Sequence, residues 1–310
     1  MTQPLIVIAG PTAAGKSDIA IALAERVGGE IINADALQLY RGMDIGTAKT
    51  PLDQRRGIAH HLFDVLSVTE EASVAAYQTA ARAAVQNIRV RGHVPIVVGG
   101  SGLYLRALTD QIRFPPTEPT VRSRLEQEVA KAGAAASHAR LRAVDPAAAE
   151  TIRPGDQRRI VRALEVNELT GGSFTAFLPR YDYHDASIVH TAITRSRSEL
   201  HARVEQRVHQ MLRHGLLDEV RALQKQGLEQ GRTARQAIGY AQALDVLHGR
   251  MNCADAIDST IAGTRRLVRK QDTWFRRDPR ISWIDPTRED PVARLAALAA
   301  RVPDEPQPET

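Results

Sequence analysis

The run from Gly10 to Ser17, GPTAAGKS, has the residue types of a phosphate-binding loop. It fits the pattern G-x-x-x-x-G-K-[ST] and lies between an apolar strand-like stretch and a helical pattern, as this motif requires. Its glycines let backbone N–H groups converge on phosphates at a helix N-terminus, while Lys16 adds a positive charge and Ser17 offers a hydroxyl to Mg²⁺. An ordinary glycine-containing turn is the alternative, which the complete motif disfavours. The sequence therefore predicts a polyphosphate site, whether or not the phosphates belong to a nucleotide.

A carboxylate, Asp35, closes a second strand-like stretch at 30–34. At the carboxyl end of a strand beside a phosphate loop, it could ligate Mg²⁺ through water or act as a general base. A helix N-cap is the structural alternative, but it does not account for the polar segment that follows. Asp35 is therefore a candidate functional residue.

A second glycine-rich loop, residues 99–102, follows the apolar run PIVV and contains Ser101. Ligands of parallel sheets bind at the carboxyl ends of the strands, so we expect this loop to lie near the first one and to share its site. His60 and His61 lack metal-ligand spacing, and we expect them to have a structural or hydrogen-bonding role.

Two helical patterns carry arginine-rich faces. The pattern at 156–170 places three arginines opposite its apolar residues: Arg158, Arg159 and Arg162. The pattern at 264–277 places Leu267, Val268, Gln271, Trp274 and Phe275 opposite six cations, Arg265, Arg266, Arg269, Lys270, Arg276 and Arg277. We expect Trp274 to be part of the core. A solvated basic face is the alternative in both helices, but the longer stripe favours nucleic acid.

The order of these patterns predicts an α/β fold, a P-loop parallel sheet with flanking helices, an inserted helical subdomain and C-terminal helices. Strands are predicted at 4–9, 30–34 and 94–98, and a further strand near 187–193 returns the chain to the sheet. The domains follow from the prolines after Phe114 and from this return: a P-loop core with C-terminal helices at 1–113 and 187–285, an inserted helical subdomain at 114–186, and a frayed tail at 286–310.

Composition narrows the class of protein further. The 310 residues carry a net charge of +5, which suits a polyanionic partner but also a solvated surface. One cysteine, Cys253, excludes a disulfide framework or a cysteine zinc site, and we expect it to be buried. No leader or membrane-spanning stretch is evident, so we expect a cytoplasmic protein, acting as a monomer.

Several ordered motifs carry a family resemblance: GPTAAGKS, NADALQLYRGMDIGTAK, HHLFDV, VVGGSGLYLRAL, RRIVRALEV, QAIGY and RKQDTWFR. In this order they resemble the bacterial tRNA dimethylallyltransferases. The resemblance implies transfer of a dimethylallyl group from dimethylallyl diphosphate to N6 of the adenosine at tRNA position 37. It also implies Mg²⁺ as the cofactor. Because water would capture the developing allylic cation, we expect this reaction to take place in a channel poor in water. A base inside a stem-loop cannot reach such a channel, so we expect the target adenosine to be flipped out.

The resemblance also assigns residues. The diphosphate would be held by Gly10, Thr12, Ala13, Ala14, Gly15, Lys16 and Ser17, with Ser17 on Mg²⁺. Asp35 matches the general base, and Ser101, the second catalytic candidate, stands where the family usually has Thr. The target nucleotide would be met by Asp35, Ala36, Leu37, Gln38 and Ser101. Other tRNA contacts would come from Arg122, Arg158, Arg159, Arg162, Gln236, Ile238, Gly239, Tyr240, Arg269, Lys270, Gln271 and Arg276. A second departure, Ala241-Gln242, leaves the contacts of its helix open.

Three other functions remain as alternatives. A P-loop kinase would bind ATP in the same loop, but the strand at 94–98 ends in glycines and not in a Walker-B Asp. An adenylate isopentenyltransferase would prenylate free nucleotides, and the inserted domain and arginine faces favour tRNA instead. A nucleic-acid-binding NTPase is disfavoured by the second glycine loop.

Overall fold

A six-stranded parallel sheet lies at the centre of the larger of two compact units. The computed structural model describes residues 3–177 and 181–301. The strands are β1 (Leu5–Ala9), β2 (Gly29–Asn33), β3 (His60–His61), β4 (Val94–Val98), β5 (Ile188–Ile193) and β6 (Ser282–Ile284), in the spatial order β3-β2-β4-β1-β5-β6. The predicted P-loop parallel sheet is confirmed, and each predicted strand lies within one residue of an observed one.

The pairing register of β1, β2 and β4 brings the carboxyl ends of these three strands to one level. Val98 of β4 pairs with Ile8 of β1 on one side and with Asn33 of β2 on the other. The segments that leave these strands are the P-loop, the turn containing Asp35 and the second glycine loop. The sheet therefore gathers all three at one edge.

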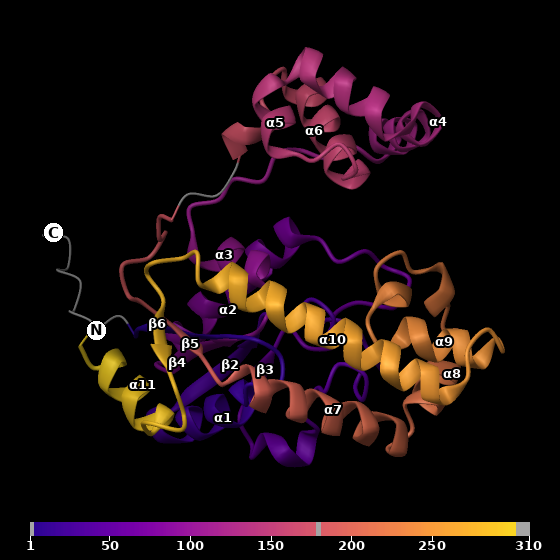
Figure 1. The fold of residues 1–310 in the computed structure, drawn as a ribbon. Coiled ribbons are helices and arrows are strands. Elements are labelled where there is room, and N and C mark those ends of the chain that lie inside the picture. Colours follow the sequence, from indigo (N-terminus) through magenta and orange to yellow (C-terminus); the bar gives the residue numbers. More distant parts are fainter. Residues whose placement is uncertain (1–2, 178–180, 302–310) are drawn as a thin grey trace, which may run out of the picture. The chain divides into compact units, whose positions relative to one another are not determined.

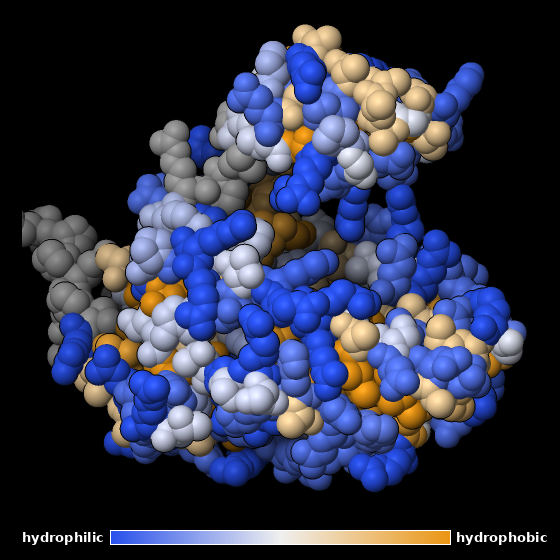
Figure 2. Space-filling model, in the orientation of Figure 1, coloured by the Kyte–Doolittle hydropathy of each residue, from blue (hydrophilic) through white to orange (hydrophobic). Residues whose placement is uncertain are grey.

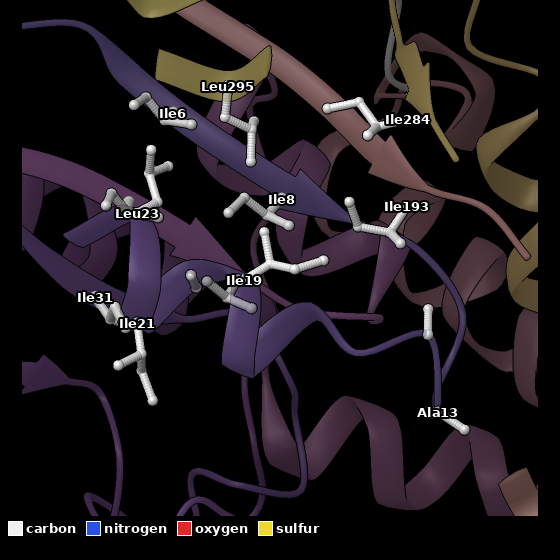
Figure 3. Packing of buried hydrophobic residues seen from close by; sticks show 14 of the residues in the cluster. Ile6, Ile8, Ala13, Ile19, Ile21, Leu23, Ile31, Ile193, Ile284 and Leu295 are labelled. Atoms are coloured by element: carbon white, nitrogen blue, oxygen red, sulfur yellow. The ribbon is translucent and has the colours of Figure 1, made fainter. Parts of the chain in front are cut away.

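Helices cover both faces of the sheet (Figure 1). On one face lie α1 (Lys16–Val27), α7 (Arg197–Arg213), α10 (Cys253–Phe275) and α11 (Pro291–Ala299), and on the other α2 (Val74–Val90) and α3 (Gly102–Thr109). Figure 3 shows Ile6 and Ile8 of β1 packed with Ile19 of α1 and Leu295 of α11. Burying each such side chain contributes about 1.5–3 kcal/mol, so this core holds the strand ends firmly in place.

Further helices form a third cluster with the segment after β2. They are α8 (Leu216–Gln224), α9 (Tyr240–Leu247) and the short turns η3 (Leu228–Gln230) and η4 (Ala234–Gln236). The short turn η1 (Leu52–Arg55) has no buried residue and lies outside this cluster. Tyr40 and Met43 from the segment after β2 pack with Leu223 of α8 and Tyr240 of α9. Among the described residues, no helix is both long and apolar enough to cross a bilayer.

In the second unit, Asp110–Asp182, the regular elements among the described residues are all helices. It contains α4 (Pro119–Val144), α5 (Pro146–Thr151), α6 (Gln157–Thr170) and η2 (Phe174–Phe177). Gly133, at φ 80°, breaks α4 into two segments. Leu125 and Leu141 of α4 pack against Ile160 and Leu164 of α6, so the unit has a core of its own.

Two expectations about the C-terminal region were wrong. Helix α11 occupies part of the segment expected to be frayed, and Leu295 on it is fully buried. The last residues, 302–310, lie outside the described part of the chain. Cys253, expected to be buried, is exposed because it is the first residue of α10, where the helix meets solvent.

Candidate active site and cationic groove

The P-loop joins β1 to α1 in a conformation that requires its glycines. Gly10 has φ 135°, and a Cβ atom there would lie 2.7 Å from the carbonyl oxygen of Ile193. Gly15 caps α1 in a left-handed conformation, and Ala13 also has a positive φ of 66°. The N–H groups in the first turn of α1 have no intrahelical partner, so they remain available to an anion. Ser17 is exposed in that same turn.

Lys16 is held back over its own loop. Its Nζ donates to the carbonyl oxygen of Pro11 at 2.8 Å. Burial lowers the pKa of Lys16 to about 8, a shift that the negative charge of Asp35 opposes and the positive charge of Arg207 reinforces. The ammonium group is therefore still mostly charged at neutral pH, and a bound anion would stabilise that charge.

Three arginines that the sequence analysis missed line the P-loop. Arg195 Nε donates to Ala14 O at 2.9 Å, and Arg203 Nε donates to Ala13 O at 2.7 Å. Arg207 Nη1 lies 3.4 Å from the Thr12 hydroxyl. The four-residue spacing of Arg203 and Arg207 placed them on one side of a helix and could have signalled a shared role.

Asp35 lies in a tight turn directly after β2. Its N–H donates to Asn33 Oδ1 at 2.8 Å, and its own Oδ1 accepts the N–H of Leu37 at 3.0 Å. Burial raises the pKa of Asp35 above its usual value, against the opposing effects of the Leu37 N–H and the charge of Lys16. Residues 36–39 form turns and no helix, so the helix N-cap alternative does not hold. A carboxylate whose pKa is raised is a better proton acceptor near neutral pH.

The second glycine loop lies against both neighbours, as expected. Ser101 Oγ accepts the N–H of Ala36 at 3.2 Å, and a Cβ atom at Gly99 would overlap the carbonyl group of Ala34. The side chain of Gln271 joins this loop to the P-loop: its Nε2 donates to Gly100 O at 3.0 Å and its Oε1 accepts the N–H of Thr12 at 2.9 Å. Together the P-loop, Asp35 and Ser101 form what we call the strand-end site.

A groove of about 500 Å³ runs along α10 beside this site. It is lined by Arg266, Arg269, Lys270, Thr273, Trp274 and Arg277, and we call it the α10 groove. The surface over α10 is mostly hydrophilic in Figure 2. Trp274 is 37% exposed, so the expectation that it belongs to the core was wrong; its indole lies against Gly102, which has no side chain to exclude it.

The six cations of the 264–277 pattern fall into two groups; four lie on α10, and Arg276 and Arg277 directly follow its last residue, Phe275. Arg265 pairs with Glu205 at 2.9 Å, and Arg276 pairs with Asp272 and stacks over the Trp283 ring. Within the described part of the chain, the side chains of the other four form no ion pair or hydrogen bond with the protein: Arg266, Arg269, Lys270 and Arg277. These four are the cations left for an external anion.

The remaining predicted tRNA residues differ in their surroundings. Arg158 and Arg159 are exposed on α6, whereas Arg122 and Arg162 both bind the buried carboxylate of Glu165. On the QAIGY segment, Gln236 is exposed and Ile238 is half-buried, but Gly239 and Tyr240 are buried. Gln242, the departure noted above, accepts the Gly239 N–H at 2.8 Å and so caps α9.

Other polar groups in the chain have structural roles. His61 Nε2 binds Glu30 at 2.5 Å and His60 Nδ1 binds the Ile58 carbonyl, which confirms the hydrogen-bonding role expected of this pair. Among the described residues, no group of three or more His, Cys, Asp or Glu side chains could hold a metal ion.

Comparison with known proteins identifies the family. A family model described as IPP transferase matches residues 38–278. The tRNA dimethylallyltransferase of Salinispora tropica is 54% identical over 297 residues, covering 95% of this chain and 93% of the relative. That of Pseudarthrobacter chlorophenolicus is 52% identical over 300 residues, covering 97% and 99%.

Solved structures agree with this assignment. A tRNA isopentenylpyrophosphate transferase from Bacillus halodurans superimposes with a TM-score of 0.70 at 36% identity, over 96% of this chain and 95% of that one. A eukaryotic dimethylallyltransferase acting on tRNA gives a TM-score of 0.79 at 27% identity, over 96% and 78%. The chain therefore belongs to the tRNA dimethylallyltransferase family, and the protein is an enzyme of the transferase class.

Proposed function

We propose that this enzyme transfers the dimethylallyl group of dimethylallyl diphosphate to N6 of the adenosine at position 37 of tRNA, next to the anticodon. The observation that carries the proposal is the meeting of three strand ends, which places an anion-binding loop, a carboxylate and a hydroxyl in one site. A kinase could use the same loop for ATP and Asp35 as the base for its acceptor hydroxyl. The family to which the chain belongs favours prenyl transfer instead, in which a weakly nucleophilic amine also needs the carboxylate.

The chemistry follows from the residue types. The lone pair of N6 is delocalised into the adenine ring, so removal of a proton must accompany attack on the allylic carbon. A C–N bond forms, the C–O bond to the diphosphate breaks, and Asp35 accepts the N6 proton. Its raised pKa suits that task. The leaving diphosphate concentrates negative charge, which Lys16, the N–H groups in the first turn of α1 and the nearby Arg207 would stabilise.

The residues of the site also suit Mg²⁺. This ion keeps several waters and usually binds one or two protein oxygens together with substrate phosphates, so a dedicated cluster of ligands is not needed. The exposed hydroxyl of Ser17 stands at the phosphate loop, and Asp35 has one carboxylate oxygen free of the Leu37 N–H. When bound, the ion would neutralise charge on the diphosphate.

The α10 groove would hold the RNA backbone. Its four unpaired cations suit phosphates, and Trp274 offers an aromatic face beside them. A base inside a stem-loop cannot reach a buried carboxylate, so the target adenosine would be flipped out. The residues of the proposed site all come from one chain, so a monomer would suffice, and an enzyme of tRNA is expected in the cytoplasm.

The direct test offers one donor and two acceptors. The protein is incubated with Mg²⁺, labelled dimethylallyl diphosphate and either bulk tRNA or AMP, and a parallel reaction replaces the donor with ATP. Label in tRNA alone, at an adenosine next to the anticodon, is the expected result. Label in AMP would favour the free-nucleotide reaction, and phosphate transfer from ATP would favour a kinase.

A further inference from the structure

Glu219 holds the loop after β2 from the far side. It lies in the first turn of α8, and its carboxylate accepts three successive backbone N–H groups: Asp44 at 3.2 Å, Ile45 at 2.7 Å and Gly46 at 3.3 Å. A carboxylate that receives several N–H groups fixes the backbone that donates them. The position of residues 44–46 therefore depends on a side chain distant in sequence.

Tyr240 completes this arrangement from α9. Its side chain is fully buried, its hydroxyl donates to Glu219 Oε1 at 2.5 Å, and its ring fills the space that a side chain at Gly46 would occupy. Burial, together with the charge of Glu219, raises the pKa of the Tyr240 phenol, so the phenol remains a donor. The family resemblance assigned Tyr240 to the tRNA interface, but its side chain faces the protein.

The held loop in turn fixes an amide beside the candidate base. Gln38 Nε2 donates to the carbonyl oxygen of Thr47 at 3.1 Å, one residue after the clamped segment. The Gln38 N–H donates to Asp35 O at 3.2 Å, which ties the same residue to the turn of Asp35. With Nε2 engaged, Oε1 of Gln38 remains as an acceptor.

Oε1 of Gln38 suits the N6 amine of the target adenosine. An exocyclic amine carries two hydrogens, of which one must go to Asp35 during transfer. The other hydrogen needs a hydrogen-bond acceptor that keeps the amine oriented toward the allylic carbon of dimethylallyl diphosphate. A glutamine turned the other way would present its NH₂ group to the amine and repel it.

We propose that Glu219 and Tyr240 are positioning residues for the transfer: through residues 44–47 they fix the amide of Gln38 so that Oε1 accepts a hydrogen from N6 of the target adenosine. This role rests on the proposed function. Neither residue touches the substrate, and both act on the orientation of the amine and not on binding of the diphosphate.

The test is a double-mutant cycle on the full-length enzyme. Glu219→Gln and Tyr240→Phe are measured alone and combined with Gln38→Ala, in single-turnover transfer at saturating donor and tRNA. Glu219→Gln puts NH₂ hydrogens against the donating N–H groups, so we expect the rate to fall about tenfold; Tyr240→Phe keeps the packing at Gly46 and should cost about threefold. The KM for the donor should stay within twofold.

In the Gln38→Ala background, both substitutions should cost less than twofold, because the group that they orient has been removed. Glu30→Gln is the matched control: it also neutralises a buried glutamate, at the opposite end of β2, and should lower the melting temperature without changing the rate. All rates are taken well below each variant's melting temperature.

Equal losses with and without Gln38, or an unchanged rate in Glu219→Gln, would overturn the positioning role while leaving the proposed function in place. A wild-type enzyme that transfers nothing to tRNA would instead reject the proposed function, and this inference with it.

Discussion

The strand-end site and the α10 groove are both rich in charged side chains, but they differ in whether those side chains have partners within the protein. At the strand ends, Lys16 and Asp35 have hydrogen-bond partners within the protein, and Arg203 donates to the P-loop itself. In the groove, four cations have no partner within the described residues. The first arrangement is preorganised, as a reaction on a small substrate requires, and the second offers charge to a large polyanion.

Of the substitutions at the two regions, Asp35→Asn should cause the largest loss of transfer activity. It keeps the shape and the hydrogen-bonding capacity of the side chain but removes its ability to accept a proton. Transfer should fall by roughly 10² to 10⁴, or about 3–5 kcal/mol of barrier, while the affinities for donor and tRNA stay within a few fold. Single-turnover kinetics across a Mg²⁺ series provides the measurement. Substantial rescue at high Mg²⁺ would mean that Asp35 is a metal ligand and not the base.

Gln271→Leu should loosen the strand-end site without altering its charges. It leaves the N–H of Thr12 and the carbonyl of Gly100 without their shared partner. The unsatisfied groups cost about 1–3 kcal/mol of stability locally, and the P-loop loses its contact with the second glycine loop. We therefore expect affinity for the donor to fall about tenfold. Gln242→Leu is the control, because Gln242 also accepts a backbone N–H but caps α9. Equal loss of donor affinity in both variants would show a general loss of stability.

The pKa of Lys16 predicts how donor binding at the strand-end site depends on pH. Because that pKa is about 8 in the free enzyme, the ammonium group loses its proton as the pH rises above 8. A bound diphosphate favours the charged form, so donor affinity should weaken above pH 8, by at most tenfold per pH unit. Calorimetric titrations from pH 7 to 9.5 measure this, with Lys16→Arg as a variant that stays charged. A flat wild-type profile would contradict the assignment.

Glu30→Gln should have the smallest effect on transfer activity, but it should clearly change how stability depends on pH. Burial alone would raise the pKa of Glu30, but hydrogen bonds from Arg91, His61 and His93 outweigh it and lower the pKa to about 2. The unfolded carboxyl titrates near 4.5, so its contribution is complete above that pH and is lost as the pH falls toward 2. Glu30→Gln should remove this part of the acid dependence in urea titrations. Identical acid profiles for variant and wild type would show that the cluster contributes nothing.

The sequence predicted the central strands well because buried parallel strands are continuous apolar runs, as in Leu5–Ala9 and Val94–Val98. It missed β3 and β6, which have two and three residues and carry polar side chains. Helix α11 was hidden by the proline-rich end that follows it. Its burial depends on contacts with α1 that no local pattern reveals.

The candidate site shows the same limit. The P-loop, Asp35 and the second glycine loop were found because each carries its own local motif. Arg195, Arg203 and Arg207 were missed because they act on a loop almost two hundred positions away. Trp274 was misplaced because helical periodicity ignores what the neighbouring element offers, here a glycine.

The salt dependence of tRNA binding tests most directly whether the α10 groove binds the RNA backbone while the strand-end site binds the donor. Wild type is compared with Arg266→Ala/Arg269→Ala/Lys270→Ala, and with Arg265→Ala, which removes a cation of the same helix that is already paired. The triple variant should weaken tRNA binding and flatten the plot of log K against log salt by about one unit or less per lost phosphate contact, while donor affinity is unchanged. Arg265→Ala should change the slope little. An unchanged slope in the triple variant, or an equal change in Arg265→Ala, would contradict the assignment of the α10 groove to RNA.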